Sequence, residues 1–187
     1  MSVTIEKVTQ LVELRAAVIR AAKNSVTAIN DLLMSHTPIE VLAHIKFCEI
    51  GFHPSDDRRL NLIEQVNQTF TYLVSFAAVE EILHRHPNSL PILLNLGTSA
   101  GSDLESKAEG VVAEVFAAVK RDNNRKLVKD VAKVASAEIV EVEICYRYVF
   151  FYSPEEKCTP FRLDDRFPTV EIVPLSKLQV WGDLQSM

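Results

Sequence analysis

"GSDLESKAEGVVAEVFAAV" (residues 101–119) has the pattern of a β-hairpin with a strongly apolar second strand. The turn is centred on residues 107–110, where Gly110 supplies the backbone freedom that a tight turn needs. With the turn in this place, Asp103 lies directly opposite Glu114, and directly opposed residues share one face with Cβ atoms roughly 5 Å apart. The hairpin therefore predicts two carboxylates side by side, one of them in the middle of an apolar strand.

These opposed acids suggest a site for a divalent cation. Strand alternation places Glu105 on the same face as Asp103. Carboxylates this close repel each other unless a cation lies between them or a proton is shared, and hard oxygen ligands suit Mg²⁺ or Mn²⁺. We therefore predict Asp103, Glu114 and Glu105 as metal ligands.

The alternative is that Glu114 is a solvated residue of a half-exposed hairpin. A slip of one residue in register would separate it from Asp103. Against this alternative, both faces of residues 111–119 are apolar, and a buried carboxylate without a partner is costly. The two interpretations stay open at this point.

The rest of the chain changes character near residue 90. Before it the pattern is helical from Thr4 to His86, with a capping box from Thr37 to Glu40 and a long helix that begins after Ser55 and ends before Pro87. The apolar stripe predicted for that helix consists of Ile63, Val66, Phe70, Leu73, Val74 and Ala77.

After Pro87 the pattern is mainly that of strands. Strands are expected at 91–97 and 138–154, with a helix at 122–136 between the hairpin and the last of these. The segments "TVEIV" and "LQVW" near the end are expected to add a strand or a short hairpin. This order predicts an α+β fold: a helical region over residues 1–55, then an αβββαβ core with a mixed sheet over residues 56–187.

Composition excludes several classes of protein. The 187 residues contain no apolar run of the roughly 18 residues that a membrane span needs, so no membrane partner is expected. Three cysteines without a Cys-x-x-Cys pair indicate reduced thiols and a cytoplasmic location. The net charge of −5 argues against a non-specific coat on nucleic acid, but it allows a nuclease with a local basic patch.

The order helix, three strands, helix, strand, with acids on the second and third strands, resembles the PD-(D/E)XK nuclease superfamily. The resemblance covers roughly residues 66 to 152 and implies a restriction-endonuclease-like core that hydrolyses DNA with Mg²⁺ or Mn²⁺. It assigns metal binding to Asp103 and Glu114. The family pattern has Pro where Ser102 stands, and it has a water-positioning Lys where Phe116 stands.

Members of that superfamily also supply the amine from a neighbouring element. Lys126 or Lys129 on the following helix would do so here, with Lys107 in the turn as a third candidate. The family often adds an acid from the preceding helix, a role that falls to Glu81 unless Glu81 forms an ion pair with Arg85. The geometric criterion is an amine within about 4 Å of the carboxylate pair, with room for water.

One face of the helix at 122–136 is basic. The residues of this face are predicted to contact DNA phosphates, and they are Arg125, Lys126, Lys129 and Lys133. The alternative is that this basic helix face is solvated surface. By analogy with nucleases that cut both strands of a duplex, we expect a homodimer. The competing hypotheses are a nuclease-fold protein without catalysis that binds nucleic acid or serves assembly, and an unrelated α+β domain.

Overall fold

The structure, a computed structural model, describes residues 2–56, 58–97, 101–163 and 166–181. The chain divides into two compact units, one formed by Met1–Val8 with Leu73–Met187 and the other by Thr9–Tyr72. The division falls inside helix α3 (Leu62–Arg85) and not near the expected boundary at residue 55. The first turns of α3 belong with the preceding helices because the Gln65 side chain is buried there.

The unit Thr9–Tyr72 contains α1 (Thr9–Ser35), α2 (Pro38–Phe47) and the two-stranded ladder of β2 (Gly51–Phe52) and β3 (Arg59–Leu60). The capping box at Thr37 is confirmed, since the Thr37 N–H donates to Glu40 Oε2 over 2.9 Å. Gln65 Oε1 accepts hydrogen bonds from the Ser25 hydroxyl and from the Phe52 N–H.

Helix α3 begins later than predicted. Residues 59–60 form β3, and the side chain of Asn61 then accepts a hydrogen bond of 2.9 Å from the Glu64 N–H, in the manner of an N-cap. This start turns Gln65 inward, while Ile63 and Val66 of the predicted stripe are exposed. The apolar stripe is therefore wrong for the first two turns of the helix.

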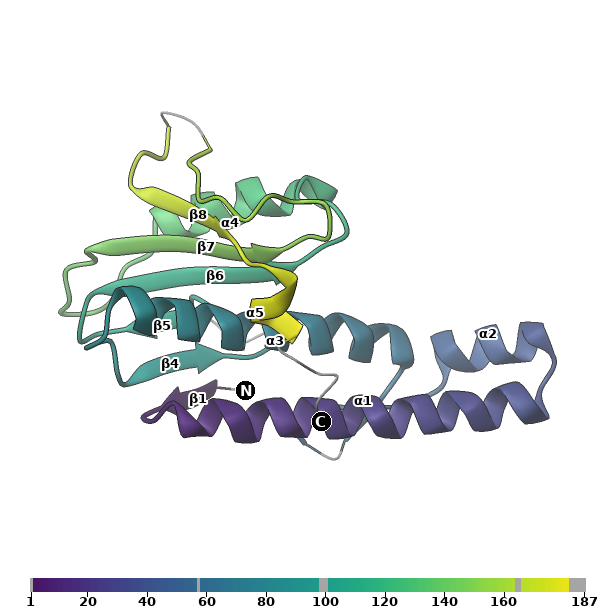
Figure 1. Cartoon of the computed structure of the whole chain (residues 1–187). Helices are drawn as coiled ribbons and strands as arrows, with labels where there is room; N and C mark the ends of the chain where they lie inside the picture. The colour runs from purple at the N-terminus through teal and green to yellow at the C-terminus, as the bar shows by residue number, and fades with distance from the viewer. Residues whose placement is uncertain (1, 57, 98–100, 164–165, 182–187) are drawn as a thin grey trace. The chain divides into compact units, whose positions relative to one another are not determined.

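The other unit is built on a six-stranded mixed sheet (Figure 1). Its strands lie in the order β1 (Ser2–Ile5), β4 (Ile92–Asn95), β5 (Leu104–Ser106), β6 (Val111–Ala117), β7 (Tyr146–Tyr152) and β8 (Val170–Pro174). The pairs from β1 to β6 are antiparallel, whereas β6, β7 and β8 are parallel. The antiparallel hairpin needs only a tight turn, and the parallel step from β6 to β7 is made through helix α4 (Lys126–Ala135).

Helices cover both faces of this sheet. Helix α4 packs on one face through Leu127, Val131 and Val134, which form one core with Val112 and Phe116 of β6. On the other face His86, just after α3, contacts the Tyr148 hydroxyl through Nε2 at 2.8 Å. The order from α3 through three strands and α4 to β7 is the predicted one, and the α+β fold with a mixed sheet is confirmed.

Three predicted elements differ from the structure. Residues 2–5 form a strand that pairs with β4 and buries Ile5, whereas the pattern predicts a helical region from Thr4 onward. Residues 138–145 are a loop with a single bridge from Ile139 to Val142, so the strand is confined to β7. The segment "LQVW" lies in helix α5 (Lys177–Trp181), where the Ser176 hydroxyl accepts a hydrogen bond of 3.2 Å from the Gln179 N–H. Within the described ranges, no helix has both the length and the apolar character to cross a membrane.

Candidate active site

The hairpin has the predicted register. Leu104 pairs with Ala113, and the turn of residues 107–110 ends at Gly110 with a φ of 61°. One step further, Asp103 stands opposite Glu114. The Asp103 N–H donates to Glu114 Oε1 over 3.2 Å, and Asp103 Oδ2 in turn accepts a hydrogen bond of 2.8 Å from the Val115 N–H. Backbone and side chain together hold the two carboxylates beside each other.

An amine reaches this carboxylate pair from helix α4. Glu114 is 2 % exposed, and its carboxylate contacts Lys133 Nζ at 2.8 Å. Lys133 reaches it because α4 lies over the face of β6 that carries Glu114, as the shared core with Val112 and Phe116 shows. An amine therefore lies within about 4 Å of Glu114, one of the two acids of the pair. The amine comes from Lys133, which was predicted as a phosphate contact, and not from Lys126 or Lys129.

Burial sets the electrostatics of the pair. Desolvation raises the pKa of Glu114 to about 7, with a further contribution from the neighbouring charge of Asp103, while the Lys133 ammonium opposes the shift. Desolvation also raises the pKa of Asp103, against the lowering effects of the Val115 N–H and of Lys133. Raised pKa values are expected for two carboxylates that lie side by side with little access to water.

A third acid, Asp130 of α4, belongs to the same cluster and was missed in the sequence. Lys126 Nζ lies 2.7 Å from Asp130 Oδ1, and Asp130 is 4 % exposed. Its pKa is raised by desolvation, with Asp103 adding to the shift. A signal was present: Asp130 lies three residues after Leu127 and four before Val134, within the apolar stripe of the helix.

Phe116 occupies the place where the resemblance expects the water-positioning Lys, and it is part of the core. Its ring stacks on Phe151 with centroids 5.2 Å apart and an interplanar angle of 11°. Lys126 lies above it, with Nζ 5.9 Å from the ring centroid. The two amines that approach the acids, Lys126 and Lys133, therefore both come from α4.

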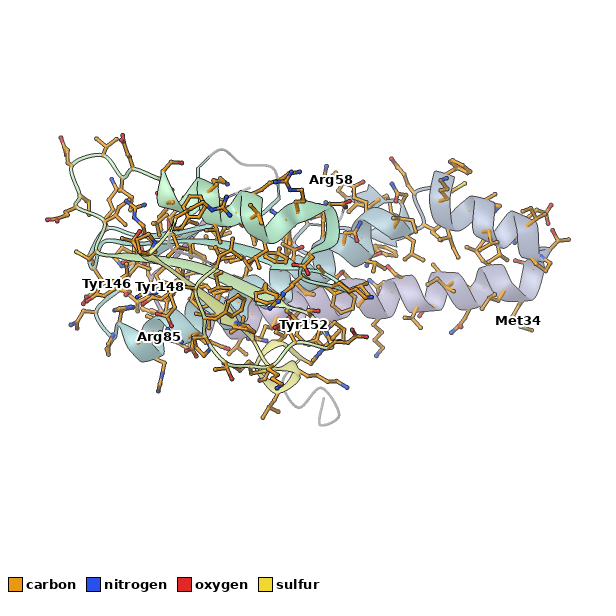
Figure 2. The ribbon with its side chains drawn as sticks, turned by 90° about the horizontal axis from the view of Figure 1, so that it is seen from above. Met34, Arg58, Arg85, Tyr146, Tyr148 and Tyr152 are labelled. Atoms are coloured by element: carbon orange, nitrogen blue, oxygen red, sulfur yellow. The ribbon has the colours of Figure 1, made fainter. Side chains whose placement is uncertain are left out.

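The other predicted acids have different partners. Glu105 Oε1 accepts a hydrogen bond of 3.2 Å from the Ser102 N–H. Glu81 forms an ion pair of 2.7 Å with Arg85, the alternative left open above, and Arg85 also contacts Glu171 at 2.8 Å. Arg85 and Tyr148 lie close together in Figure 2, with the guanidinium carbon 5.5 Å from the ring centroid.

The described part of the chain holds no group of three or more His, Cys, Asp or Glu side chains placed to bind a metal ion. Glu105 and Glu81 do not join Asp103 and Glu114 in such a group. Of the remaining predicted phosphate contacts, Lys129 is exposed, and Arg125 is exposed with a left-handed backbone (φ 56°) just before α4. The predicted residues that come together are thus Asp103, Glu114, Lys126 and Lys133.

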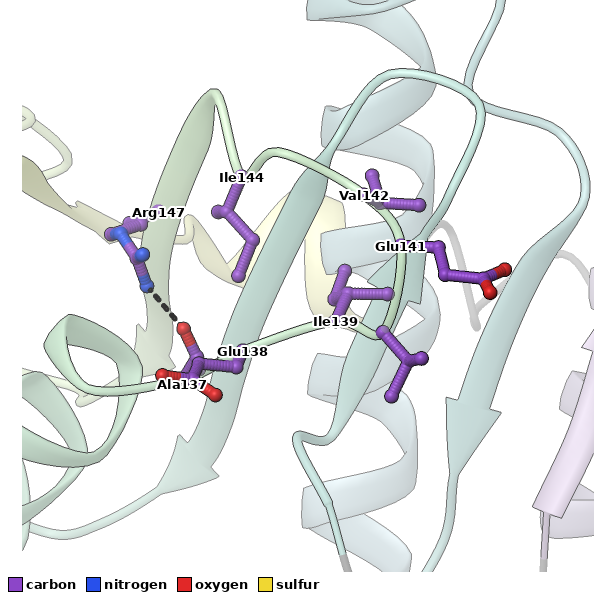
Figure 3. Close-up of a pocket in the computed structure, with 8 residues that line it drawn as sticks. Ala137, Glu138, Ile139, Glu141, Val142, Ile144 and Arg147 are labelled. Atoms are coloured by element: carbon purple, nitrogen blue, oxygen red, sulfur yellow. Dashed lines mark hydrogen bonds between the residues drawn. The ribbon is translucent and has the colours of Figure 1, made fainter.

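A pocket of about 390 Å³ lies elsewhere, along residues 137–147. Apolar side chains such as Ile139, Val142 and Ile144 line it, together with Arg147 (Figure 3). The Arg147 guanidinium binds the backbone, since its Nη1 donates hydrogen bonds to the carbonyl oxygens of Val134 and Ala137. None of the carboxylates or amines of the cluster lines this pocket.

Comparisons with protein-family models, with curated proteins and with solved structures find no match for this chain. Two buried carboxylates, Glu114 and Asp130, and the half-buried carboxylate of Asp103 face two ammonium groups. Such a set can bind a cation, hold water or contact a phosphate.

Proposed function

We propose that this chain is a metal-dependent nuclease that hydrolyses phosphodiester bonds of DNA, with Asp103 and Glu114 as direct ligands of Mg²⁺ or Mn²⁺. The observation that carries the proposal is the contact of Lys133 with buried Glu114, which in turn accepts a hydrogen bond from the Asp103 N–H. Two acids and one amine are the side chains that the PD-(D/E)XK resemblance requires. In this chain the amine would come from α4, because Phe116 takes the usual position.

The residues fit a hydrated divalent cation. Mg²⁺ is usually held by one or two carboxylates and keeps several waters, so Asp103 and Glu114 suffice as direct ligands. Asp130 carries a buried oxygen, Oδ2, without a hydrogen-bond partner among the described residues. Three carboxylates against two ammonium groups also leave the cluster short of positive charge. Both observations favour a cation.

Each side chain then has a role in hydrolysis. Asp103 and Glu114 hold the cation, which when bound stabilises the charge that develops on the phosphate. Lys133 is 48 % exposed, so its ammonium can leave Glu114 and orient the attacking water or a phosphate oxygen. Lys126 supplies a second positive charge on the same side of the sheet. The exposed Arg125 and Lys129 would contact the DNA backbone further along α4.

The test combines thermal unfolding with a cleavage assay. Millimolar Mn²⁺ should raise the unfolding midpoint of the wild type by the usual binding linkage, and it should fail to do so for Glu114→Gln. Cleavage of duplex or single-stranded DNA with Mg²⁺ or Mn²⁺ should be lost in Asp103→Asn and in Glu114→Gln. Glu105→Gln, in the same hairpin, is the matched control and should keep both properties. An unmoved wild-type midpoint, with Glu114→Gln neutral or more stable, would contradict the proposal.

A second candidate is a nuclease-fold protein without catalysis that binds nucleic acid or serves assembly. The stacking of Phe116 on Phe151 favours it, because a core aromatic ring replaces the usual amine. This candidate predicts DNA binding without cleavage and no response to Mn²⁺. DNA retention in EDTA together with intact DNA in Mg²⁺ would support it over the nuclease.

We also propose a cytoplasmic location and a two-fold homodimer. Cys48, Cys145 and Cys158 are exposed free thiols, which suits a reducing compartment. A dimer is the usual means by which one kind of site reaches both strands of a duplex. Sedimentation of the purified chain, with and without DNA, tests the dimer.

A further inference from the structure

Asp130 has one carboxylate oxygen that the described structure leaves unexplained. Oδ1 is paired with Lys126 at 2.7 Å, whereas Oδ2 is buried and has no hydrogen-bond partner among the described residues. A buried acceptor left unsatisfied is costly, and more so when it is charged, so native structures seldom keep one without a ligand or a water. The carboxylate belongs to the acidic cluster because Asp130 lies three residues before Lys133 on the same face of α4, and the Lys133 ammonium contacts Glu114 at 2.8 Å.

Asp130 is buried because it lies within the apolar stripe of α4. Its neighbours in the stripe, Leu127, Val131 and Val134, pack in the apolar core, and Asp130 is as buried as they are. An ion pair with Lys126 alone does not require such burial, since an acid on the outer face of the helix would form an i, i+4 pair equally well. The burial points the acid toward the sheet and not toward solvent.

We propose that Asp130 is an outer ligand of the cation site: its Oδ2 accepts a hydrogen bond from a water bound to the cation that Asp103 and Glu114 hold directly. The inference rests on the proposed function. It agrees with the absence of a three-ligand group in the described residues, because an outer ligand need not reach the metal itself. Mg²⁺ retains waters of this kind, and acceptors for them tune its affinity. Oδ1 already accepts a hydrogen bond from Lys126, so Oδ2 is the acceptor that remains for the water.

The experiment measures Mn²⁺ affinity by calorimetry and by the electron paramagnetic resonance of free Mn²⁺, without DNA. Asp130→Asn should weaken binding by about 10- to 100-fold, the range known for outer-shell partners. Asp122→Asn, an exposed Asp just before α4, is the matched control and should bind as the wild type does. Circular dichroism verifies folding, and Asp130→Ser serves as the second variant if Asp130→Asn does not fold.

Lys126→Met separates this role from a structural one. If Asp130 holds a cation-bound water, removing the neighbouring positive charge leaves Mn²⁺ affinity unchanged or higher. A loss in Lys126→Met as large as that in Asp130→Asn would overturn the inference, because Asp130 would then act only by placing Lys126. Unchanged affinity in Asp130→Asn also overturns it, while the proposed nuclease survives. A wild type that binds no Mn²⁺ overturns both.

Discussion

The ammonium of Lys133 lies 2.8 Å from the carboxylate of Glu114, across the layer between helix α4 and the centre of strand β6. The acid is buried and the amine is half exposed, so only one of the two ions is fully desolvated. This asymmetry decides what each substitution does. Removing the amine leaves an uncompensated buried carboxylate, whereas neutralising the acid leaves an amine that can turn to solvent.

Lys133→Met should therefore destabilise the protein more than Glu114→Gln does. Breaking a fully buried pair costs about 3–5 kcal/mol, and the exposure of Lys133 reduces this to about 1–2 kcal/mol. Urea unfolding at pH 8, where Glu114 is ionised, measures the difference. The Lys133→Met/Glu114→Gln double variant should recover most of the loss. Lys129→Met, on an exposed part of the same helix, should change the free energy of unfolding by less than about 0.5 kcal/mol.

Stability should fall with rising pH because of Glu114. Its folded-state pKa of about 7 lies above the ordinary value of 4.5, so between these values the native state binds the proton more tightly than the unfolded chain does. The contribution is complete below pH 4.5, declines as pH rises, and is lost above pH 7. The raised pKa values of Asp103 and Asp130 act in the same direction.

The buried histidines act in the opposite direction, so a difference measurement is needed. Burial lowers the pKa of His53 and of His86, and such groups make the folded state more stable as pH rises. The free energy of unfolding of wild type minus that of Glu114→Gln removes their common contribution. This difference should decline from pH 4.5 to 7 and then level off. A difference that is flat across that interval, in EDTA, would mean that Glu114 has an ordinary pKa.

Glu81 should matter for stability and not for the cation. Its carboxylate pairs with Arg85 at 2.7 Å, and both side chains are partly buried. Glu81→Gln should cost about 1 kcal/mol on unfolding. The Mn²⁺-dependent rise in midpoint should equal that of the wild type. A smaller Mn²⁺-dependent rise in the midpoint of Glu81→Gln would indicate that Glu81 takes part in cation binding.

The fold was predictable where local pattern and tertiary packing agree. The hairpin at Gly110 has its predicted turn and register, because a tight turn and an apolar strand fix pairing together. Residues 2–5 were not predictable as a strand, since their pairing with β4 joins segments about ninety residues apart that carry no local signal for each other. The segment 138–145 alternates like a strand, but the structure forms only one bridge there.

The part of the site that lies on the β5–β6 hairpin was predictable from the sequence. Asp103 lies opposite Glu114 because the position of the turn sets the register of the two strands. Which lysine of α4 contacts Glu114, Lys133 or Lys126, depends on where the helix crosses β6. That crossing is a tertiary property set by Leu127 and Val131 packing on the sheet. Asp130 could have been found from its place in the apolar stripe, by the same reasoning that singled out Glu114.

Phe116 should behave as a core residue and not as a degenerate catalytic position. It is almost fully buried and stacks on Phe151. Phe116→Ala should cost about 3–5 kcal/mol, the usual range for a buried aromatic ring. Phe47→Ala, at an exposed phenylalanine, should cost less than about 0.5 kcal/mol. A cost below 1 kcal/mol for Phe116→Ala would contradict a core role for this ring.

The last prediction concerns DNA contact along α4. Arg125 and Lys129 are exposed, while Lys133 is paired with Glu114, so the first two should carry most of the phosphate contact when no cation is present. Each lost contact should lower the slope of log affinity against log salt concentration by about 0.9 on duplex DNA. Fluorescence anisotropy in EDTA at several salt concentrations measures this for Lys129→Ala, Arg125→Ala and the double variant.

Lys133→Ala gives the comparison within the same helix. In EDTA it should change the slope little, and with Mn²⁺ it should change the slope as Lys129→Ala does, because the cation would take the place of the ammonium beside Glu114. Lys107→Ala, at an exposed residue of the hairpin turn, is the control and should leave the slope unchanged. If the slopes of Lys129→Ala and Arg125→Ala match the wild type, α4 makes no phosphate contact and its basic face is solvated surface.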